Sequence, residues 1–184
     1  MTDHALLVID LQRGAFDGAR CPQIDGAQTL LGNARALIDA ARASGTPVVF
    51  VQHCEAEAGS PFETDSPHGD LEPALGALSG DLVVRKQASS AFDNTTIVQT
   101  LAELGARKLL LCGLQSEFCV SNTARSALAA GYDVLIAEDA HGTWASDGQA
   151  AAAIAARVNA ELLAAGAKLQ PTSCIVQSLA TSAT

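Results

Sequence analysis

The chain has 184 residues, which is the length of one α/β domain. Hydrophobic residues make up 48% of it and charged residues 17%, which excludes a disordered chain. Twenty acidic residues against eleven basic ones give a net charge of −9, which disfavours nucleic-acid binding because the phosphate backbone is also negative. We therefore expect a single globular domain over residues 1–184 that binds no nucleic acid.

The sequence also carries signals about location and cysteine chemistry. No apolar run reaches the ~18 residues of a membrane span, and Met1–His4 lacks the basic segment of a signal peptide. These features predict a cytoplasmic protein with no membrane partner. The cysteines are odd in number and no two are spaced Cys-x-x-Cys, which predicts free thiols and no structural zinc site. They are Cys21, Cys54, Cys112, Cys119 and Cys174.

The first half of the chain reads as strand, helix, strand and long loop. Ala5–Asp10 is an apolar run that ends in an acid, which is typical of a parallel strand buried on both faces. Apolar residues recur at helical spacing over 26–44, and Gly45 ends this predicted helix. Residues 46–52 are β-branched and predict a strand. Residues 54–73 are rich in Gly, Pro, Ser and acidic residues, which predicts a long loop. Loops of this length in compact domains often have a function.

The second half continues the alternation of strand and helix. Strands are predicted at 81–86, 108–113, 133–137 and 168–170, and helices at 93–104, 117–130 and 146–165. This alternation predicts a single-domain, three-layer α/β/α fold with a six-stranded, mostly parallel sheet. In such sheets ligands bind beyond the carboxyl ends of the strands.

Three reactive side chains fall at those strand ends: Asp10, Lys86 and Cys119. Ser116 is a good helix N-cap, which would place Cys119 in the first helical turn. There the helix dipole and Lys86 would lower the pKa of the thiol, and free backbone amides could bind an oxyanion. Each residue also has an ordinary reading, as an inert buried cysteine, a solvated aspartate or a surface lysine.

Four blocks of this sequence resemble, in order, those of the isochorismatase-like cysteine hydrolases of the nicotinamidase/isochorismatase superfamily. The blocks are Ala5–Gln12, Lys86–Thr95, Gly113–Arg125, and Gly131–Val134 with Glu138–Ala140. The resemblance extends over about residues 5–140. It implies a six-stranded parallel sheet with flanking helices, and an enzyme that hydrolyses non-peptide amide (C–N) bonds of small molecules.

The resemblance also implies roles for individual residues. Cys119 would be the nucleophile that forms a thioester, Asp10 the base that takes its proton, and Lys86 the third member of the triad. A non-proline cis peptide would join Leu114 to Gln115. The amides of Gln115 and Cys119 would then form the oxyanion hole.

The sequence departs from part of the family pattern. Nicotinamidase-like members carry an Asp-x-His metal box after the second strand, but no Asp stands two residues before His53, and His68 is alone in its loop. We therefore expect no metal and no other cofactor. His53 is assigned to the pocket wall instead. His141 either faces the same edge or caps a loop.

Candidate wall residues are the aromatic side chains near the strand ends, together with His53. Since a lone aromatic residue is usually part of the core, at least one of them is expected there. With few charged groups apparent, we expect a small, neutral, partly apolar substrate. The aromatic candidates are Phe16, Phe92, Phe118 and Trp144.

Apolar helix faces, such as 124–130 and 150–156, exceed what one small sheet can cover. Because family members commonly assemble, a homo-oligomer, either a dimer or a tetramer, is expected.

The sequence also bears on other functions. An isochorismatase-type vinyl-ether hydrolase needs no thiol, so Cys119 counts against it. A non-catalytic or redox-sensing member of the same fold stays open, because a reactive thiol serves either purpose. The Gly-x-Cys-x-Gly elbow of an α/β-hydrolase and the Gly-x-Gly-x-x-Gly turn of a nucleotide- or flavin-binding module are both missing.

Overall fold

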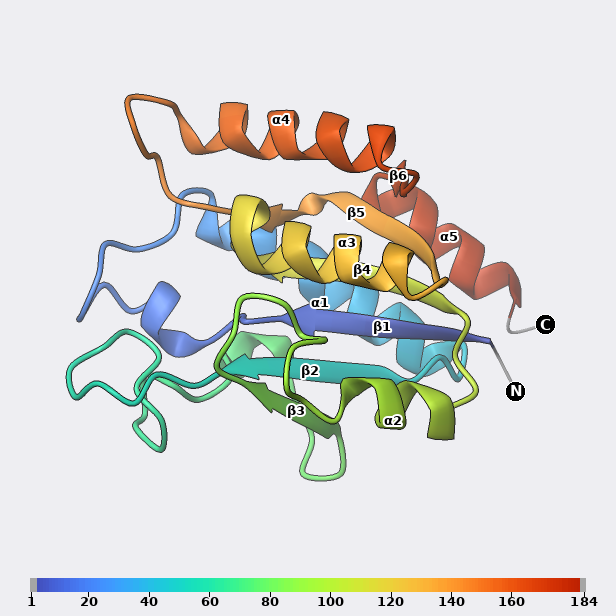
Figure 1. Ribbon diagram of the computed structural model, residues 1–184, viewed down its shortest axis with the longest axis horizontal. Helices are drawn as coiled ribbons and strands as arrows, with labels where there is room; N and C mark the ends of the chain where they lie inside the picture. Colours follow the sequence, from blue (N-terminus) through green and yellow to red (C-terminus); the bar gives the residue numbers. More distant parts are fainter. Residues whose placement is uncertain (1–2, 183–184) are drawn as a thin grey trace.

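The computed structural model describes residues 3–182, and within that range the chain forms one six-stranded sheet (Figure 1). The strand order is β3-β2-β1-β4-β5-β6, and all five neighbouring pairs are parallel. The predicted six-stranded parallel sheet is therefore confirmed. The strands are β1 (His4–Ile9), β2 (Val48–His53), β3 (Leu82–Lys86), β4 (Lys108–Leu114), β5 (Asp133–Gly142) and β6 (Lys168–Gln170).

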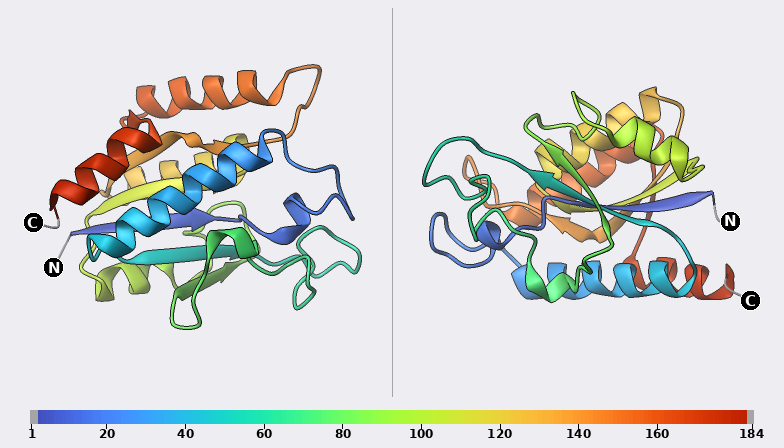
Figure 2. Two further views of the ribbon diagram at one scale, coloured as in Figure 1. Left: turned by 180° about the vertical axis from the view of Figure 1, so that it is seen from behind. Right: turned by 90° about the horizontal axis from the view of Figure 1, so that it is seen from below.

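Helices cover both faces of this sheet and complete the predicted three layers (Figure 2). One face carries α1 (Ala27–Ala43) and α5 (Thr172–Ser182), and the other carries α2 (Ile97–Glu103), α3 (Ser121–Ala129) and α4 (Ala151–Ala164). Helix α5 was not predicted from the sequence. It packs along α1 with Ile175 buried. No helix among residues 3–182 is both long enough and apolar enough to cross a bilayer.

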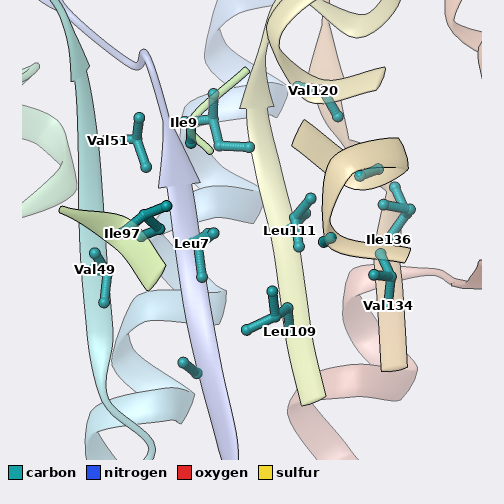
Figure 3. Packing of buried hydrophobic residues seen from close by; sticks show 14 of the residues in the cluster. Leu7, Ile9, Val49, Val51, Ile97, Leu109, Leu111, Val120, Val134 and Ile136 are labelled. Carbon is teal, nitrogen blue, oxygen red and sulfur yellow. The ribbon is translucent and has the colours of Figure 1, made fainter. Parts of the chain in front are cut away.

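Strand β1 lies at the centre of the sheet because its side chains are apolar on both faces. Leu6 and Val8 belong to the core under α1, whereas Leu7 and Ile9 belong to the core under α2, α3 and α4 (Figure 3). All four side chains are fully buried, and burying such a side chain contributes roughly 1.5–3 kcal/mol.

Several element bounds differ from the predicted ones. Helix α2 begins at Ile97 rather than at residue 93. Asn94 has a left-handed backbone conformation (φ 54°), and the Thr95 hydroxyl accepts a hydrogen bond from the Ile97 amide. Helix α4 begins at Ala151 rather than at residue 146. Strand β5 extends to Gly142, well past residue 137, after a register shift in its pairing with β4.

The order of the strands reverses between β1 and β4. The chain leaves β1 towards β2, while β4 pairs with the opposite side of β1. At this point Gly113 lies so close to β1 that a Cβ atom would sit 2.0 Å from the Ile9 carbonyl oxygen. Only glycine fits here, and the loops after β1 and β4 then diverge. A crevice at such a switch point is where ligands bind in open α/β sheets.

Candidate active site

A buried ion pair joins the ends of β1 and β3. Asp10 follows β1 in a left-handed conformation (φ 52°), which aspartate tolerates better than most residues, and its amide bonds to the Val51 carbonyl. The Lys86 Nζ atom lies 2.7 Å from Asp10 Oδ2, and the two side chains are 0% and 3% exposed. Since burying two charges is costly, such a pair needs further polar contacts around it.

The ammonium of Lys86 supplies those contacts. Its Nζ atom lies 3.2 Å from Cys119 Sγ, 3.1 Å from the Ala88 carbonyl oxygen and 3.2 Å from His53 Nδ1. Asp10, Lys86 and Cys119, predicted from three separate strand ends, are therefore brought together by the fold.

The ring of His53 is part of this cluster. Burial, followed by the charge of Lys86, lowers the pKa of His53, so the imidazole is neutral near pH 7. Because Lys86 is a donor, His53 Nδ1 accepts, and the imidazole proton lies on Nε2.

Cys119 lies in a turn of π-helix, Ser116–Val120, which precedes α3. Residues 115–120 are called the Cys119 turn below. The sequence predicted Ser116 as the N-cap of this helix, but Gln115 is the N-cap. The buried Ser116 hydroxyl forms a hydrogen bond with His141 instead. Helix α3 therefore begins only after the turn. A single π-turn at a functional site is a recurrent arrangement.

Two backbone amides of this turn, at Gln115 and Cys119, are candidates for binding an oxyanion. The peptide bond from Leu114 to Gln115 is cis. The Gln115 carbonyl accepts hydrogen bonds from the amides of Phe118 and Val120, both at 3.1 Å, and not from the amide of Cys119. Within residues 3–182 the Gln115 amide donates no backbone hydrogen bond. The amides of Gln115 and Cys119 are thus the candidates for an oxyanion hole.

The protonation state of Cys119 differs from the sequence-based expectation. Burial, together with the nearby Asp10, raises the pKa of Cys119 to about 11, and Lys86 opposes this only in part. The expected lowering of the thiol pKa by a helix dipole and Lys86 was therefore wrong, because burial disfavours the thiolate and the charge of Lys86 is already balanced by Asp10. The resting residue is a thiol.

Asp10 is suited to receive the proton of that thiol. Burial raises the pKa of Asp10, against the opposing effect of Lys86, and so makes the carboxylate a stronger base. Oδ2 is engaged by Lys86, whereas the buried Oδ1 has no hydrogen-bond partner among the described residues. One carboxylate oxygen is therefore free for proton transfer.

An open cleft of about 500 Å³ adjoins Gln115. Two of its lining side chains, Asp25 and Glu55, are carboxylates, and none is basic. A second open cavity of about 550 Å³ is lined in part by Lys86 and Arg85. The cleft beside Gln115 is lined by Cys21, Pro22, Gln23, Asp25, Glu55, Pro61, Phe62, Gln115, Trp144 and Ala145.

Of the predicted wall residues, Trp144 lines this cleft, and its indole nitrogen donates to the Pro22 carbonyl at 2.7 Å. Phe16 does not line it, because its ring is buried in the core under α1. Phe92 packs against Tyr132 instead, with ring centroids 5.9 Å apart. Phe118 also lies outside the cleft lining and is 53% exposed. His53 lies within the buried cluster at Lys86 rather than on the cleft wall.

Sequence reasoning missed two residues of the site. Phe62 lines the cleft and packs edge-on against His53, with ring centroids 6.2 Å apart. Gln12 is fully buried and holds the end of β2: its side chain exchanges hydrogen bonds of 2.8 and 2.9 Å with the His53 backbone and donates to the Gly69 carbonyl. The signal for Gln12 was its place two residues after Asp10.

The side chains considered as metal ligands have other partners. His53 Nδ1 accepts from Lys86, and His68 is paired with Asp17. Among residues 3–182 no three His, Cys, Asp or Glu side chains are grouped as metal ligands would be.

The chain is similar to known proteins in sequence and in fold. Residues 4–167 match the model of the isochorismatase domain family. The chain is 35% identical over 144 residues to a streptothricin hydrolase of Streptomyces noursei, covering 77% of this chain and 55% of that protein. It is 30% identical over 175 residues to a ureidoacrylate amidohydrolase of Variovorax paradoxus, covering 76% and 68%. The chain thus spans about half the length of the streptothricin hydrolases it matches.

Among solved structures, an isochorismatase from Pseudomonas putida superimposes with a TM-score of 0.82 at 33% identity, covering 94% of this chain and 89% of that one. The family model covers most of the chain, and the sheet, the strand order and the cluster at Cys119 are in place. The chain therefore belongs to the isochorismatase family.

Proposed function

We propose that this protein is a cysteine hydrolase that cleaves an amide-type C–N bond of a small molecule. The observation that carries the proposal is the contact of Lys86 Nζ with both Asp10 and Cys119, beside the free amide of Gln115. Two similar proteins, a streptothricin hydrolase and a ureidoacrylate amidohydrolase, are named as hydrolases, which supports the same reaction class.

The first half of the proposed reaction forms a thioester. Because Cys119 rests as a thiol, its proton passes to Asp10 as the sulfur attacks the carbonyl carbon. The C=O electron pair moves onto oxygen, and the amides of Gln115 and Cys119 bind that oxyanion. When the intermediate collapses, the C–N bond breaks and Asp10 returns the proton to the leaving nitrogen. Lys86 holds the carboxylate and the sulfur in contact throughout.

The second half hydrolyses the thioester. Asp10, again a carboxylate, accepts a proton from water as the water oxygen attacks the thioester carbon. The C–S bond then breaks, the carboxylic acid leaves, and the sulfur takes the proton back from Asp10. Each proton taken up by Asp10 is thus released, and the enzyme returns to the thiol–carboxylate state.

The charge of the cleft bears on which amides fit. In the cleft beside Gln115, Asp25 and Glu55 are the charged side chains and none is basic, so a substrate carboxylate that occupies this cleft would be repelled. The sequence alone suggested a neutral substrate; the lining favours neutral or cationic amides over anionic ones. Phe62 and Trp144 supply apolar surface for the rest of the molecule.

The test is a panel of primary and cyclic amides and ureido compounds, matched in size and carrying a neutral, a cationic or an anionic group. Ammonia release or ring opening is followed with the native chain and with Cys119→Ala. Turnover by the native chain alone, with anionic members poorest, is the expected result. Hydrolysis that persists in Cys119→Ala, or no hydrolysis of any member, would overturn the proposal.

Two further expectations from the sequence stay predictions. We propose a homo-oligomer, a dimer or tetramer, since the large apolar side chains of Val98, Phe118 and Leu163 are more than half exposed. Light scattering behind size exclusion measures the mass directly. A cytoplasmic location stays the expectation for this chain.

A further inference from the structure

A second polar cluster lies directly behind the Cys119 turn. The Ser116 hydroxyl, on the turn, lies 2.8 Å from His141 Nδ1, and His141 Nε2 lies 2.8 Å from Asn159 Oδ1. Ser116 and His141 are buried, at 0% and 6% exposure. These three residues come from the turn, from the end of β5 and from α4, and none has a part in the reaction proposed above.

The hydrogen bonds fix which nitrogen of His141 carries the proton. The amide nitrogen of Asn159 donates to the Glu138 carbonyl at 3.1 Å, so the side-chain oxygen is the atom that faces His141. Nε2 must therefore donate. In the neutral imidazole Nδ1 then accepts the Ser116 hydroxyl proton, whereas in the protonated imidazole Nδ1 donates to the hydroxyl oxygen.

The surroundings of His141 favour this neutral form. Burial lowers the pKa of His141, against the opposing effects of Asn159, Asp139, Glu117 and Glu138. Glu117 stands on the turn itself and is held by the Thr143 hydroxyl at 2.8 Å, which ties the turn to the chain after β5 a second time.

We propose that neutral His141 is a positioning residue for the Cys119 turn: by accepting the Ser116 hydroxyl proton it holds the turn that presents the Gln115 and Cys119 amides. If His141 gains a proton, Nδ1 becomes a donor and the hydrogen bond reverses, so the Ser116 hydroxyl must rotate and accept instead. This change in the contact shifts the Cys119 turn and with it the two amides of the oxyanion hole. For catalysis this inference rests on the proposed function, but its first test needs no substrate.

The test uses Asn159→Asp, which keeps the shape and the acceptor oxygen and adds a negative charge that stabilises protonated His141. It also removes the N–H that donates to the Glu138 carbonyl, a loss that the control must match. The matched control is Asn33→Asp, because Asn33 likewise donates to a carbonyl of β5, that of Asp139. Among residues 3–182 the side-chain hydrogen bonds of His141 go to Ser116 and Asn159 and not to Asn33. Thermal melts check that both variants fold.

NMR titrations then follow the His141 imidazole and the backbone amides of Gln115 and Cys119. The expected result is that the two amides titrate together with His141, at a pH at least one unit higher in Asn159→Asp and unchanged in Asn33→Asp. Amide signals that do not follow the imidazole, or a midpoint that Asn159→Asp leaves in place, would overturn the proposal.

A kinetic arm separates positioning from general destabilisation. With any amide that the native chain hydrolyses, Asn159→Asp should lower kcat at least fivefold at pH 6, approach native kcat at pH 9, and leave KM within about twofold. A loss of kcat that is equal at both pH values contradicts a positioning role. Absence of native turnover counts against the proposed function alone, since the NMR arm still decides the role of His141.

Discussion

Cys112 and Cys119 lie seven residues apart and show what separates an inert thiol from a usable one. Burial raises the pKa of both, to about 12 for Cys112 in the middle of β4 and to about 11 for Cys119 after its end. Cys112 is packed in the apolar core under α1, and its thiol donates to the Leu7 carbonyl at 3.8 Å. Cys119 has an ammonium and a carboxylate beside it instead. Both thiols rest protonated, but only Cys119 has a base to take its proton.

The largest expected contrast is in turnover after each cysteine is removed. Cys119→Ala should lower kcat at least about 10³-fold, because no other group can form the covalent intermediate. Cys112→Ala should keep turnover within about twofold and lose about 1 kcal/mol of stability through the small cavity left behind. The measurement is ammonia release together with urea unfolding of both variants. Equal turnover in the two would remove the distinction between the thiols.

Asp10 distinguishes Cys119 from Cys112, because Cys112 has no such base beside it. Asp10→Asn keeps the shape but cannot take a proton, and we expect turnover to fall about 10²–10⁴-fold. Asp39→Asn, on the exposed face of α1, is the control and should leave turnover unchanged. Turnover of Asp10→Asn comparable to the control would assign the base to another residue.

A smaller effect is expected on the stability that the buried Asp10–Lys86 ion pair gives to the fold. Lys86→Met leaves the buried Asp10 carboxylate without its partner and should cost about 3–5 kcal/mol in the free energy of unfolding. The double variant Asp10→Asn, Lys86→Met should cost clearly less than the sum of the two single changes. Lys108→Met breaks a half-exposed pair with Asp3 and should cost far less. Additive losses at Asp10 and Lys86 would mean that the pair is not coupled.

Much of the candidate site at the carboxyl edge of the sheet was predictable, because the ends of strands can be predicted from sequence patterns. Asp10 and Lys86 each end an apolar or β-branched run, and in a parallel sheet all carboxyl ends meet at one edge. Cys119 follows the third such run and a short turn. The fold class and the meeting of these three residues therefore depend on patterns that lie within a few residues of each strand end.

Other features depended on packing between distant segments. Ser116 is a residue type that often caps helices, but its hydroxyl forms a hydrogen bond with His141, 25 residues later in the chain. The π-turn that contains Ser116 has no simple local sequence pattern. The raised pKa of Cys119 comes from burial and from Asp10, neither of which is visible in the local sequence. Whether Phe16 or Phe62 lines the cleft depends on the course of a long loop.

The most direct test of the central claim is site-resolved alkylation of Cys119 across pH, in the native chain and in Asp10→Asn. In the native chain the thiol pKa is raised, so alkylation by iodoacetamide should be slow at pH 7 and climb towards pH 11. Asp10→Asn removes one cause of that raised pKa and leaves Lys86 to pair with the thiolate. The account predicts that the Cys119 curve then moves to lower pH while the exposed Cys174 is unchanged. A Cys119 curve that is the same in both proteins would contradict the assignment of Asp10 as the group that controls this thiol.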